Sequence, residues 1–170
     1  MEKWDILNCN GQPMGKTVVR GRSILSSGEY HLVVHIWIIS DDGKYLIQRR
    51  SEKKLLMPGE WAATGGAAVA GEDSFTAASR ELKEELGIES SKETLKFLKR
   101  IKRKNAFVDV WVMNTNIPVY KLRLQKNEVS TAKWVTKAKL KEMIKKGKFH
   151  DYGSYYWQVI FGEDERKEIV

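Results

Sequence analysis

Three glutamates, Glu81, Glu84 and Glu85, have the residue type and the spacing to do chemistry together. On a helix, positions i, i+3 and i+4 place their side chains next to one another. Adjacent carboxylates repel each other, so such a surface is stabilised by a cation placed among them. Mg²⁺, a hard ion that prefers oxygen ligands, meets this requirement. The alternative is a solvated acidic face whose surface ion pairs contribute little.

The segment around these glutamates has further residue types at fixed offsets. Residues 66–88 read Gly-x5-Glu-x7-Arg-Glu-U-x-Glu-Glu-x-Gly-U, where U is a bulky aliphatic residue. The pattern resembles the signature of Nudix hydrolases, with every fixed position filled: Gly66, Glu72, Arg80, Glu81, Leu82, Glu84, Glu85, Gly87 and Ile88. The resemblance implies hydrolysis of a pyrophosphate bond in a nucleoside diphosphate linked to another moiety, with Mg²⁺ or Mn²⁺ as cofactor.

The same resemblance implies roles for individual residues. Arg80 would position a catalytic glutamate, and Gly66 would let the backbone pass close to metal and phosphates. One of the helix glutamates would also help to deprotonate water. The chemistry agrees, because substitution at phosphorus needs neutralised phosphate oxygens and an oriented water, which carboxylate-bound metal ions supply. The expected metal ligands are Glu72, Glu81, Glu84 and Glu85.

Residues outside this segment supply further candidates. Glu128 resembles a glutamate that precedes a Trp-Val strand in the family, where relatives use a later acidic residue as base or extra ligand. The other interpretation of Glu128 is a surface residue at a strand edge. Basic residues at the expected mouth of the site suit substrate phosphates, or else form a solvated rim. Those expected to bind substrate, together with Gly66, are Arg20, Arg49, Arg50 and Lys53.

Residues 2–90 also resemble the isopentenyl diphosphate isomerase-like branch of this family. The catalytic residues of the isomerases are not matched, since Ile24, Gly65, Asn105 and Phe107 stand at or near their places. Isomerase activity is therefore the alternative function, not the main expectation. His31 matches a metal ligand of the isomerases, but without its partners we expect a strand histidine satisfied by hydrogen bonds.

The elements that position these residues follow from the sequence pattern. A helix is expected over residues 73–86, capped by Asp73 or Ser74 at its start and Gly87 at its end. Asn10-Gly11 predicts an N-terminal β-hairpin. Strands are expected at residues 32–40, 45–49, 95–101, 106–113 and 131–135, and further helices near 137–146 and 153–161. The fold class is α+β, and the resemblance implies a Nudix fold with a mixed sheet between helices (α/β/α).

Composition limits the remaining possibilities. The 170 residues fit a single domain, 1–170, of which residues 1–30 form the hairpin extension. A net charge of +8 suits an anionic small molecule such as a nucleotide or other diphosphate. Nucleic acid is the weaker alternative, suggested by the basic segment 96–104 and the basic helix. A lone Cys9, no signal peptide and no membrane span predict a cytoplasmic protein, and the family resemblance leaves a homodimer open.

Overall fold

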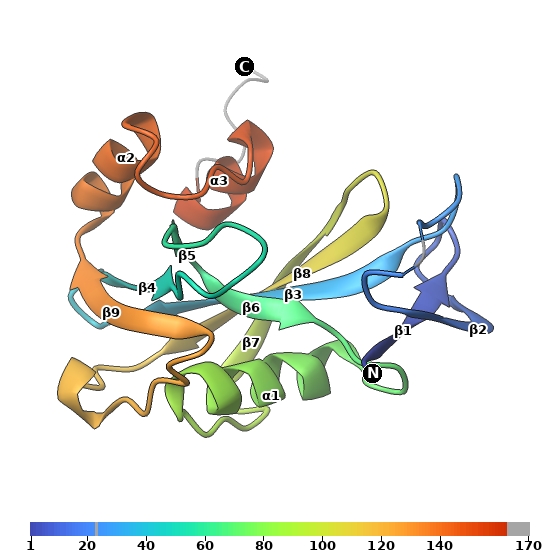
Figure 1. Ribbon diagram of the computed structural model, residues 1–170. Coiled ribbons are helices and arrows are strands. Elements are labelled where there is room, and N and C mark those ends of the chain that lie inside the picture. Colours follow the sequence, from blue (N-terminus) through green and yellow to red (C-terminus); the bar gives the residue numbers. More distant parts are fainter. Residues whose placement is uncertain (23, 163–170) are drawn as a thin grey trace, which may run out of the picture.

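The computed structural model describes residues 1–22 and 24–162, and Figure 1 shows the arrangement of its elements. The helices are close to the expected positions. Two short strands, Trp61–Ala62 and Thr64–Ala67, were not expected, and the strand Val129–Val135 begins earlier than expected. The elements run in the order β1 (Lys3–Leu7), β2 (Pro13–Val19), β3 (His31–Ile39), β4 (Tyr45–Arg50), β5 (Trp61–Ala62), β6 (Thr64–Ala67), α1 (Ser74–Leu86), β7 (Leu95–Lys102), β8 (Ala106–Asn114), η1 (Val119–Lys121), β9 (Val129–Val135), α2 (Lys137–Lys145) and α3 (Ser154–Phe161).

The main sheet is mixed, as predicted. Its strand order is β5-β4-β3-β8-β7, with β6 paired to β3 and β9 paired to β4. β3 and β8 run parallel over their whole length, from His31↔Ala106 to Ile39↔Asn114, while the other pairings are antiparallel. β6 pairs with β3 from Val33↔Ala67 to Ile36↔Thr64 and forms an edge of the sheet beside α1.

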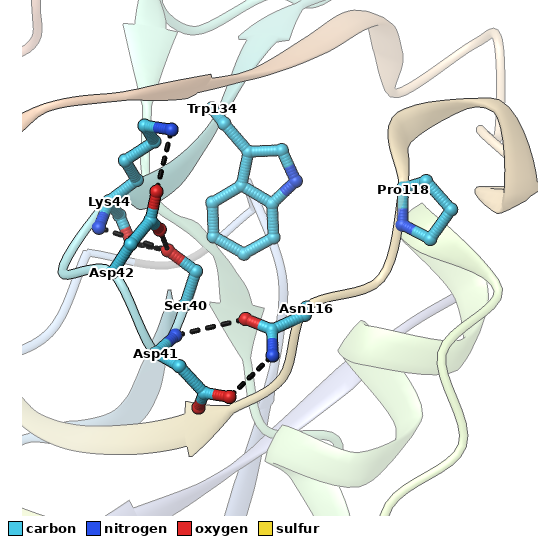
Figure 2. A pocket seen from close by; sticks show the side chains of 7 residues that line it. All are labelled: Ser40, Asp41, Asp42, Lys44, Asn116, Pro118 and Trp134. Carbon is cyan, nitrogen blue, oxygen red and sulfur yellow. Dashed lines mark hydrogen bonds and ion pairs between the residues drawn. The ribbon is translucent and has the colours of Figure 1, made fainter.

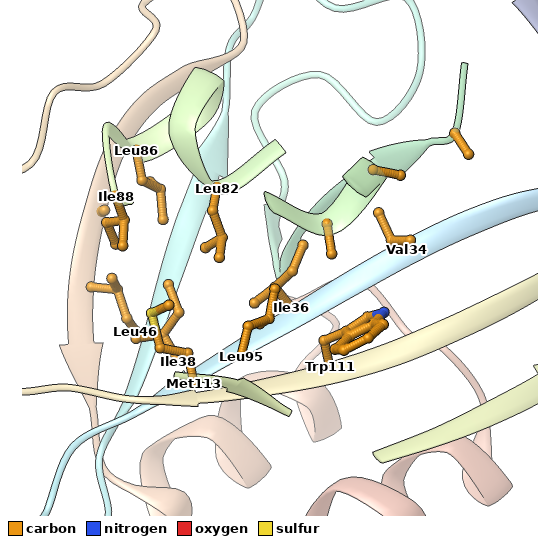
Figure 3. Close-up of a cluster of buried hydrophobic side chains, with 14 residues drawn as sticks. Val34, Ile36, Ile38, Leu46, Leu82, Leu86, Ile88, Leu95, Trp111 and Met113 are labelled. Atoms are coloured by element: carbon orange, nitrogen blue, oxygen red, sulfur yellow. The ribbon is translucent and has the colours of Figure 1, made fainter. Parts of the chain in front are cut away.

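Helices cover both faces of this sheet, which confirms the expected three-layer arrangement. In Figure 1, α1 lies below the sheet, and α2 and α3 lie above it. Successive residues of β3 point to opposite faces. Ile36 therefore packs in the hydrophobic cluster between the sheet and α1, and Trp37 packs in the cluster between the sheet and α3. Figure 3 shows Leu82 and Leu86 of α1 above this first cluster. Both leucines are fully buried, and Leu→Ala at either would cost about 2–5 kcal/mol of stability.

The N-terminal hairpin is present and forms a small sheet of its own. β1 and β2 pair antiparallel, with Trp4 opposite Val18, and lie at the far end of the main sheet in Figure 1. Leu7 and Tyr30 exchange backbone hydrogen bonds of 2.8 and 3.0 Å. The Gly71 backbone N–H also donates to Asp5 Oδ2 at 2.7 Å. The hairpin is therefore attached close to the loop that leads into α1.

Helix α1 begins and ends as its sequence predicts. The Asp73 side chain accepts a hydrogen bond from the Thr76 backbone N–H at 2.7 Å, so Asp73 is the N-cap. Gly87 has φ 71° and donates its N–H to the carbonyls of Leu82 and Lys83. A side chain at Gly87 would also meet Arg123 Cβ at 2.7 Å. No helix in the described part of the chain is long and apolar enough to cross a membrane.

Candidate functional site

A cleft of about 460 Å³ opens beside the first half of β3, above the edge strand β6 and the end of α1. Strand β4, the loop after it, the loop before β9 and the N-terminal hairpin supply other parts of its wall. It brings together most of the residues singled out from the sequence: Arg20, Arg50, Gly66, Arg80, Glu81, Glu84, Glu85 and Glu128. Glu72 is not part of this wall but reaches the site through Arg80.

Arg80 holds the acidic side chains of the site together. Its Nε and Nη2 donate to both carboxylate oxygens of Glu72, at 2.7 and 3.0 Å. Its Nη1 donates to Glu81 at 2.9 Å and to Glu84 at 3.0 Å. Nη2 also donates to the Ala67 carbonyl at 3.1 Å, which ties the helix to the loop before it. Because a guanidinium has five donors in a fixed plane, one arginine can orient all these groups.

Glu72 closes the loop between β6 and α1. Its Oε2 accepts a hydrogen bond from the Val69 backbone N–H at 2.8 Å in addition to the bond from Arg80. These hydrogen bonds favour the ionised carboxylate and lower the pKa of Glu72 despite its partial burial. Glu72 therefore holds the loop and anchors Arg80.

Glu85 is held by a buried chain of polar groups that the sequence analysis did not assign to the site. Gln48 Nε2 donates to Glu85 Oε2 at 2.8 Å, and the Gly65 backbone N–H donates to the same oxygen at 3.2 Å. Thr64 Oγ1 in turn donates to Gln48 Oε1 at 3.2 Å. The signal was available, because a glutamine inside an apolar strand needs a buried polar partner.

Two of the three α1 glutamates are buried. Glu81 and Glu85 are 9% and 4% exposed, while Glu84 is exposed. Burial, followed by the charge of Glu81, raises the pKa of Glu85 to about 8. Burial also raises the pKa of Glu81, with Glu84 and Glu128 adding to the effect and Arg80 opposing it. Ionising both carboxylates is therefore costly unless positive charge comes close to them.

The donor set of this cleft fits a hard divalent cation. Carboxylate oxygens on adjacent helix turns are the ligands that Mg²⁺ and Mn²⁺ prefer, and a bound cation would offset the burial that raises the pKa of Glu81 and of Glu85. Glu81 and Glu84 each accept a hydrogen bond from Arg80 in this structure. Within residues 1–22 and 24–162, no three acidic, histidine or cysteine side chains stand in the arrangement of a preformed metal site.

Glu128 lies in the cleft wall and forms an ion pair with Lys54 of the loop after β4. Glu81 lines the same cleft, and the charge of Glu128 adds to the rise in the pKa of Glu81. Arg50 lies in the same wall, where its charge partly opposes the burial that raises the pKa of Glu85. Its Nε donates to the Leu56 carbonyl at 3.1 Å. This part of the cleft therefore has cationic groups facing the acidic helix.

Two of the basic residues expected to bind substrate do not line the cleft. The Arg49 guanidinium binds the Gly59 carbonyl at 2.9 Å and Glu52 at 3.0 Å. Lys53 is exposed in the loop after β4, outside the cleft wall. Alternation along β4 explains this for Arg49, because Gln48 and Arg50 point to the side where Glu85 lies. Lys54, not Lys53, occupies the position at the cleft.

The two histidines of β3 differ in their surroundings. His35 Nδ1 pairs with the Tyr156 hydroxyl at 2.9 Å, and burial lowers the pKa of His35 to about 3. His31 stacks on Trp4, with ring centroids 4.1 Å apart and 9° between planes. Its Nδ1 is buried without any hydrogen-bond partner among the described residues. For His31 the expectation of a satisfied strand histidine is therefore wrong.

A second hollow, of about 470 Å³, lies at the turn between β3 and β4 and contains none of the residues singled out from the sequence. Figure 2 shows that its polar groups pair with each other. Asn116 Oδ1 accepts from the Asp41 backbone N–H at 2.9 Å, and Lys44 pairs with Asp42 at 2.6 Å. With these groups already satisfied, this hollow has less to offer a ligand than the cleft at α1.

Comparisons with a family model and with known proteins point to the same family. Residues 29–158 match the model of the NUDIX domain. An uncharacterized Nudix hydrolase of Listeria monocytogenes is 40% identical over 155 residues, which covers 89% of this chain and 90% of that protein.

Solved structures share the fold. The crystal structure of DR0079 from Deinococcus radiodurans has a TM-score of 0.77 at 24% identity, covering 94% of this chain and 98% of that one. The NUDIX domain of Shewanella oneidensis NrtR, solved with ADP ribose, has a TM-score of 0.60 at 16% identity over 88% of this chain and 94% of that one. The family match and the geometry of α1 agree: the chain belongs to the Nudix hydrolases and is an enzyme that acts on pyrophosphate bonds.

Proposed function

We propose that this cleft hydrolyses a pyrophosphate bond in a nucleoside diphosphate linked to another moiety, with Mg²⁺ or Mn²⁺ as cofactor. One observation carries the proposal: Glu81, Glu84 and Glu85 of α1 line one cleft together with the arginine that orients two of them. Glu81, Glu84 and Glu85 would hold the metal, with a minor contribution from Glu72. When bound, the cation would neutralise phosphate oxygens and lower the pKa of water.

The protein's own residues would place the substrate and manage protons. Arg50 and Lys54 have cationic groups in the cleft wall that suit the oxygens of a diphosphate, and Arg20 adds a third charge at the hairpin side. Glu128 is the candidate base outside α1, since it lies near Glu81 and is released to act if Lys54 turns to a phosphate. Gly66 keeps the space that the Glu81 carboxylate occupies.

Two features support a nucleotide-linked substrate. The chain is basic overall, which favours an anionic ligand. The structurally similar NrtR domain was solved with ADP ribose, a nucleoside diphosphate joined to a second sugar. We also propose a cytoplasmic protein with a single domain; a homodimer through the exposed side of the hairpin is a further proposal.

The alternative functions find less support. The resemblance to the isomerase-like branch places Ile24 where an isomerase has a histidine ligand, and Ile24 is 98% exposed and has no ligand atom. Asn105 hydrogen bonds to the Glu29 carbonyl at 3.3 Å and has no carboxylate to offer. An RNA-binding role would use β7, but Arg100 of that strand is committed to Asp109 at 2.6 Å.

The proposal is tested with the purified protein and a panel of nucleoside diphosphates, nucleotide sugars and dinucleoside polyphosphates. Products are followed by phosphate release coupled to a phosphatase, with Mg²⁺, with Mn²⁺ and with a chelator. We expect metal-dependent hydrolysis of at least one compound in the panel. Hydrolysis that is equal with and without chelator would contradict the metal requirement, and conversion of isopentenyl to dimethylallyl diphosphate would favour the isomerase.

A further inference from the structure

The cleft continues past the carboxylates onto the other face of the sheet. Along β3, Val34 and Ile36 point toward α1, so His31, Val33 and His35 point to the opposite face. These three residues nevertheless line the same cleft as the α1 glutamates. The passage between the two faces runs over the edge strand β6, where Gly65, Gly66 and Ala67 have little or no side chain.

The part of the cleft on this second face is aromatic. We refer to Trp4, His31, Val33, His35 and Tyr152 as the aromatic end of the cleft. His35 contacts the Tyr152 ring at a centroid distance of 4.7 Å, and the Tyr152 hydroxyl accepts from the Ala63 backbone N–H at 3.2 Å. Burial keeps His35 uncharged, because it lowers the pKa of that residue to about 3. This end therefore differs sharply from the charged end at α1.

The hairpin fixes the outer wall of the aromatic end. Trp4 has its indole N–H bonded to Glu2 at 3.2 Å, and Glu2 also binds Arg20 at 3.1 Å. Arg20 lies over one side of the Trp4 ring at 5.9 Å, while His31 is stacked at 4.1 Å. Glu2 and Arg20 therefore hold Trp4 in position, and the stacked Trp4 ring fixes the plane of the His31 imidazole.

His31 is the residue of this wall with an unmet requirement. Its Nδ1 is the one buried side-chain polar atom, among those the structure describes, that has no hydrogen-bond partner. Burial and the charge of Arg20 lower its pKa, so its ring is neutral at physiological pH and can both donate and accept. Because Nδ1 is closed to solvent, a bound molecule reaches it only when the imidazole rotates by half a turn about its Cβ–Cγ bond, which keeps the ring stacked on Trp4. A molecule that then supplies the partner removes the free-energy cost of the unpaired group.

We infer that the aromatic end binds the nucleobase of the substrate and that His31 is a specificity-determining residue that hydrogen bonds to it. A nucleobase is a neutral, flat ring with polar edges, which matches an aromatic surface, flanked by the Glu2–Arg20 ion pair, that has one unsatisfied imidazole. The inference rests on the proposed function, because the diphosphate would occupy the α1 end of the same cleft. The hairpin is then part of the substrate site.

The test compares binding of two kinds of probe in the presence of Mg²⁺. One is methylenediphosphonate, which has no nucleoside; the others are the non-hydrolysable α,β-methylene diphosphates of adenosine, guanosine, cytidine and uridine. Dissociation constants are measured by calorimetry for the wild type, His31→Phe, His31→Asn and Tyr120→Phe. His31→Phe keeps a ring beside Trp4, whereas His31→Asn keeps a polar group near the position of Nδ1. Tyr120 is exposed in η1, outside the cleft wall, and is the control.

We expect at least one nucleoside probe to bind the wild type at least tenfold more tightly than methylenediphosphonate. His31→Phe should weaken that probe about tenfold, the usual effect of one hydrogen bond to a buried group, and leave methylenediphosphonate unchanged. His31→Asn should recover part of the loss, and Tyr120→Phe should match the wild type.

Two results would overturn the inference. If the wild type binds methylenediphosphonate as tightly as every nucleoside probe, the aromatic end does not read a base, and the proposed function is unaffected. If His31→Phe weakens all probes equally, or none, His31 has no selective role. Binding of no probe at all would overturn the proposed function as well.

Discussion

Arg80 binds Glu72 through two parallel hydrogen bonds, of 2.7 and 3.0 Å, although the loop and the first turns of α1 separate the two residues. The same guanidinium reaches Glu81 and Glu84. The loop before the helix and the acidic face of the helix are thus joined at one side chain. The position of the carboxylates depends on this link as well as on helical spacing.

Replacing Arg80 by lysine should separate positioning from charge. Lysine keeps the positive charge but cannot form the planar, forked contacts with Glu72. We expect kcat of Arg80→Lys to fall about 10- to 100-fold, a loss typical of residues that orient metal ligands. The helical neighbour Lys83 pairs with exposed Glu89, so Lys83→Ala is the control and should keep wild-type kcat. Equal kcat for Arg80→Lys and the wild type would contradict the positioning role.

Gln48 should matter for metal binding, although it lies outside the motif. Gln48→Leu removes the donor to Glu85 Oε2 and leaves Thr64 Oγ1 without its acceptor. We expect the Mn²⁺ dissociation constant, measured by electron paramagnetic resonance, to rise about 10- to 100-fold. Thr64→Val, which affects only the outer link, should give a smaller rise. A variant that folds normally and binds Mn²⁺ as the wild type does would show that Gln48 has no orienting effect.

Gly66 is required for space rather than for backbone freedom. A Cβ at this position would lie 2.3 Å from Glu81 Oε1 and 2.7 Å from its Cδ. In Gly66→Ala the Glu81 carboxylate must move, and a displacement of about 1 Å can cost roughly 100-fold in rate. Because the end of the Glu81 side chain can turn, the melting temperature should change little. A large loss of melting temperature with unchanged activity would contradict this account.

The raised pKa of Glu85 predicts that the metal-free protein loses stability as the pH rises. Between the ordinary value of 4.5 and about 8, the folded protein keeps a proton on Glu85 that the unfolded chain has lost. Stability therefore falls with pH over this range, by an amount on the order of a few kcal/mol.

Glu85→Gln provides the measurement for this effect. A glutamine can still accept from Gln48 and Gly65 through its carbonyl oxygen but does not ionise. In chelator, its melting temperature relative to the wild type should rise from pH 5 to pH 8. Mg²⁺ should reduce the difference, because it binds the ionised wild-type site. A difference that is independent of pH would show that Glu85 ionises normally.

The fold and the centre of the site were predictable because their signals are local. The cap at Asp73 and the left-handed Gly87 defined the ends of α1, and helical spacing then placed the glutamates. The Asn10-Gly11 signal likewise located the hairpin.

Other features depend on contacts between distant segments, which spacing within one segment does not encode. Gln48 meets Glu85 across 37 positions, and Trp4 meets His31 only once the hairpin has docked. Whether Arg49 or Arg50 enters the cleft depends on the side of β4 that faces Glu85. The unpaired Nδ1 of His31 could be found only after the packing around it was known.

The most direct test of the central claim is Mg²⁺-dependent hydrolysis by Glu85→Gln and Glu84→Gln, measured on the best substrate of the panel. Glu89→Gln is the control, because Glu89 lies just after α1 and is exposed. With the fold confirmed by circular dichroism, both helix variants should lose at least a thousandfold in kcat, and the control should not. Wild-type turnover in a folded Glu85→Gln protein would contradict the assignment of the α1 carboxylates as the metal-binding catalytic site.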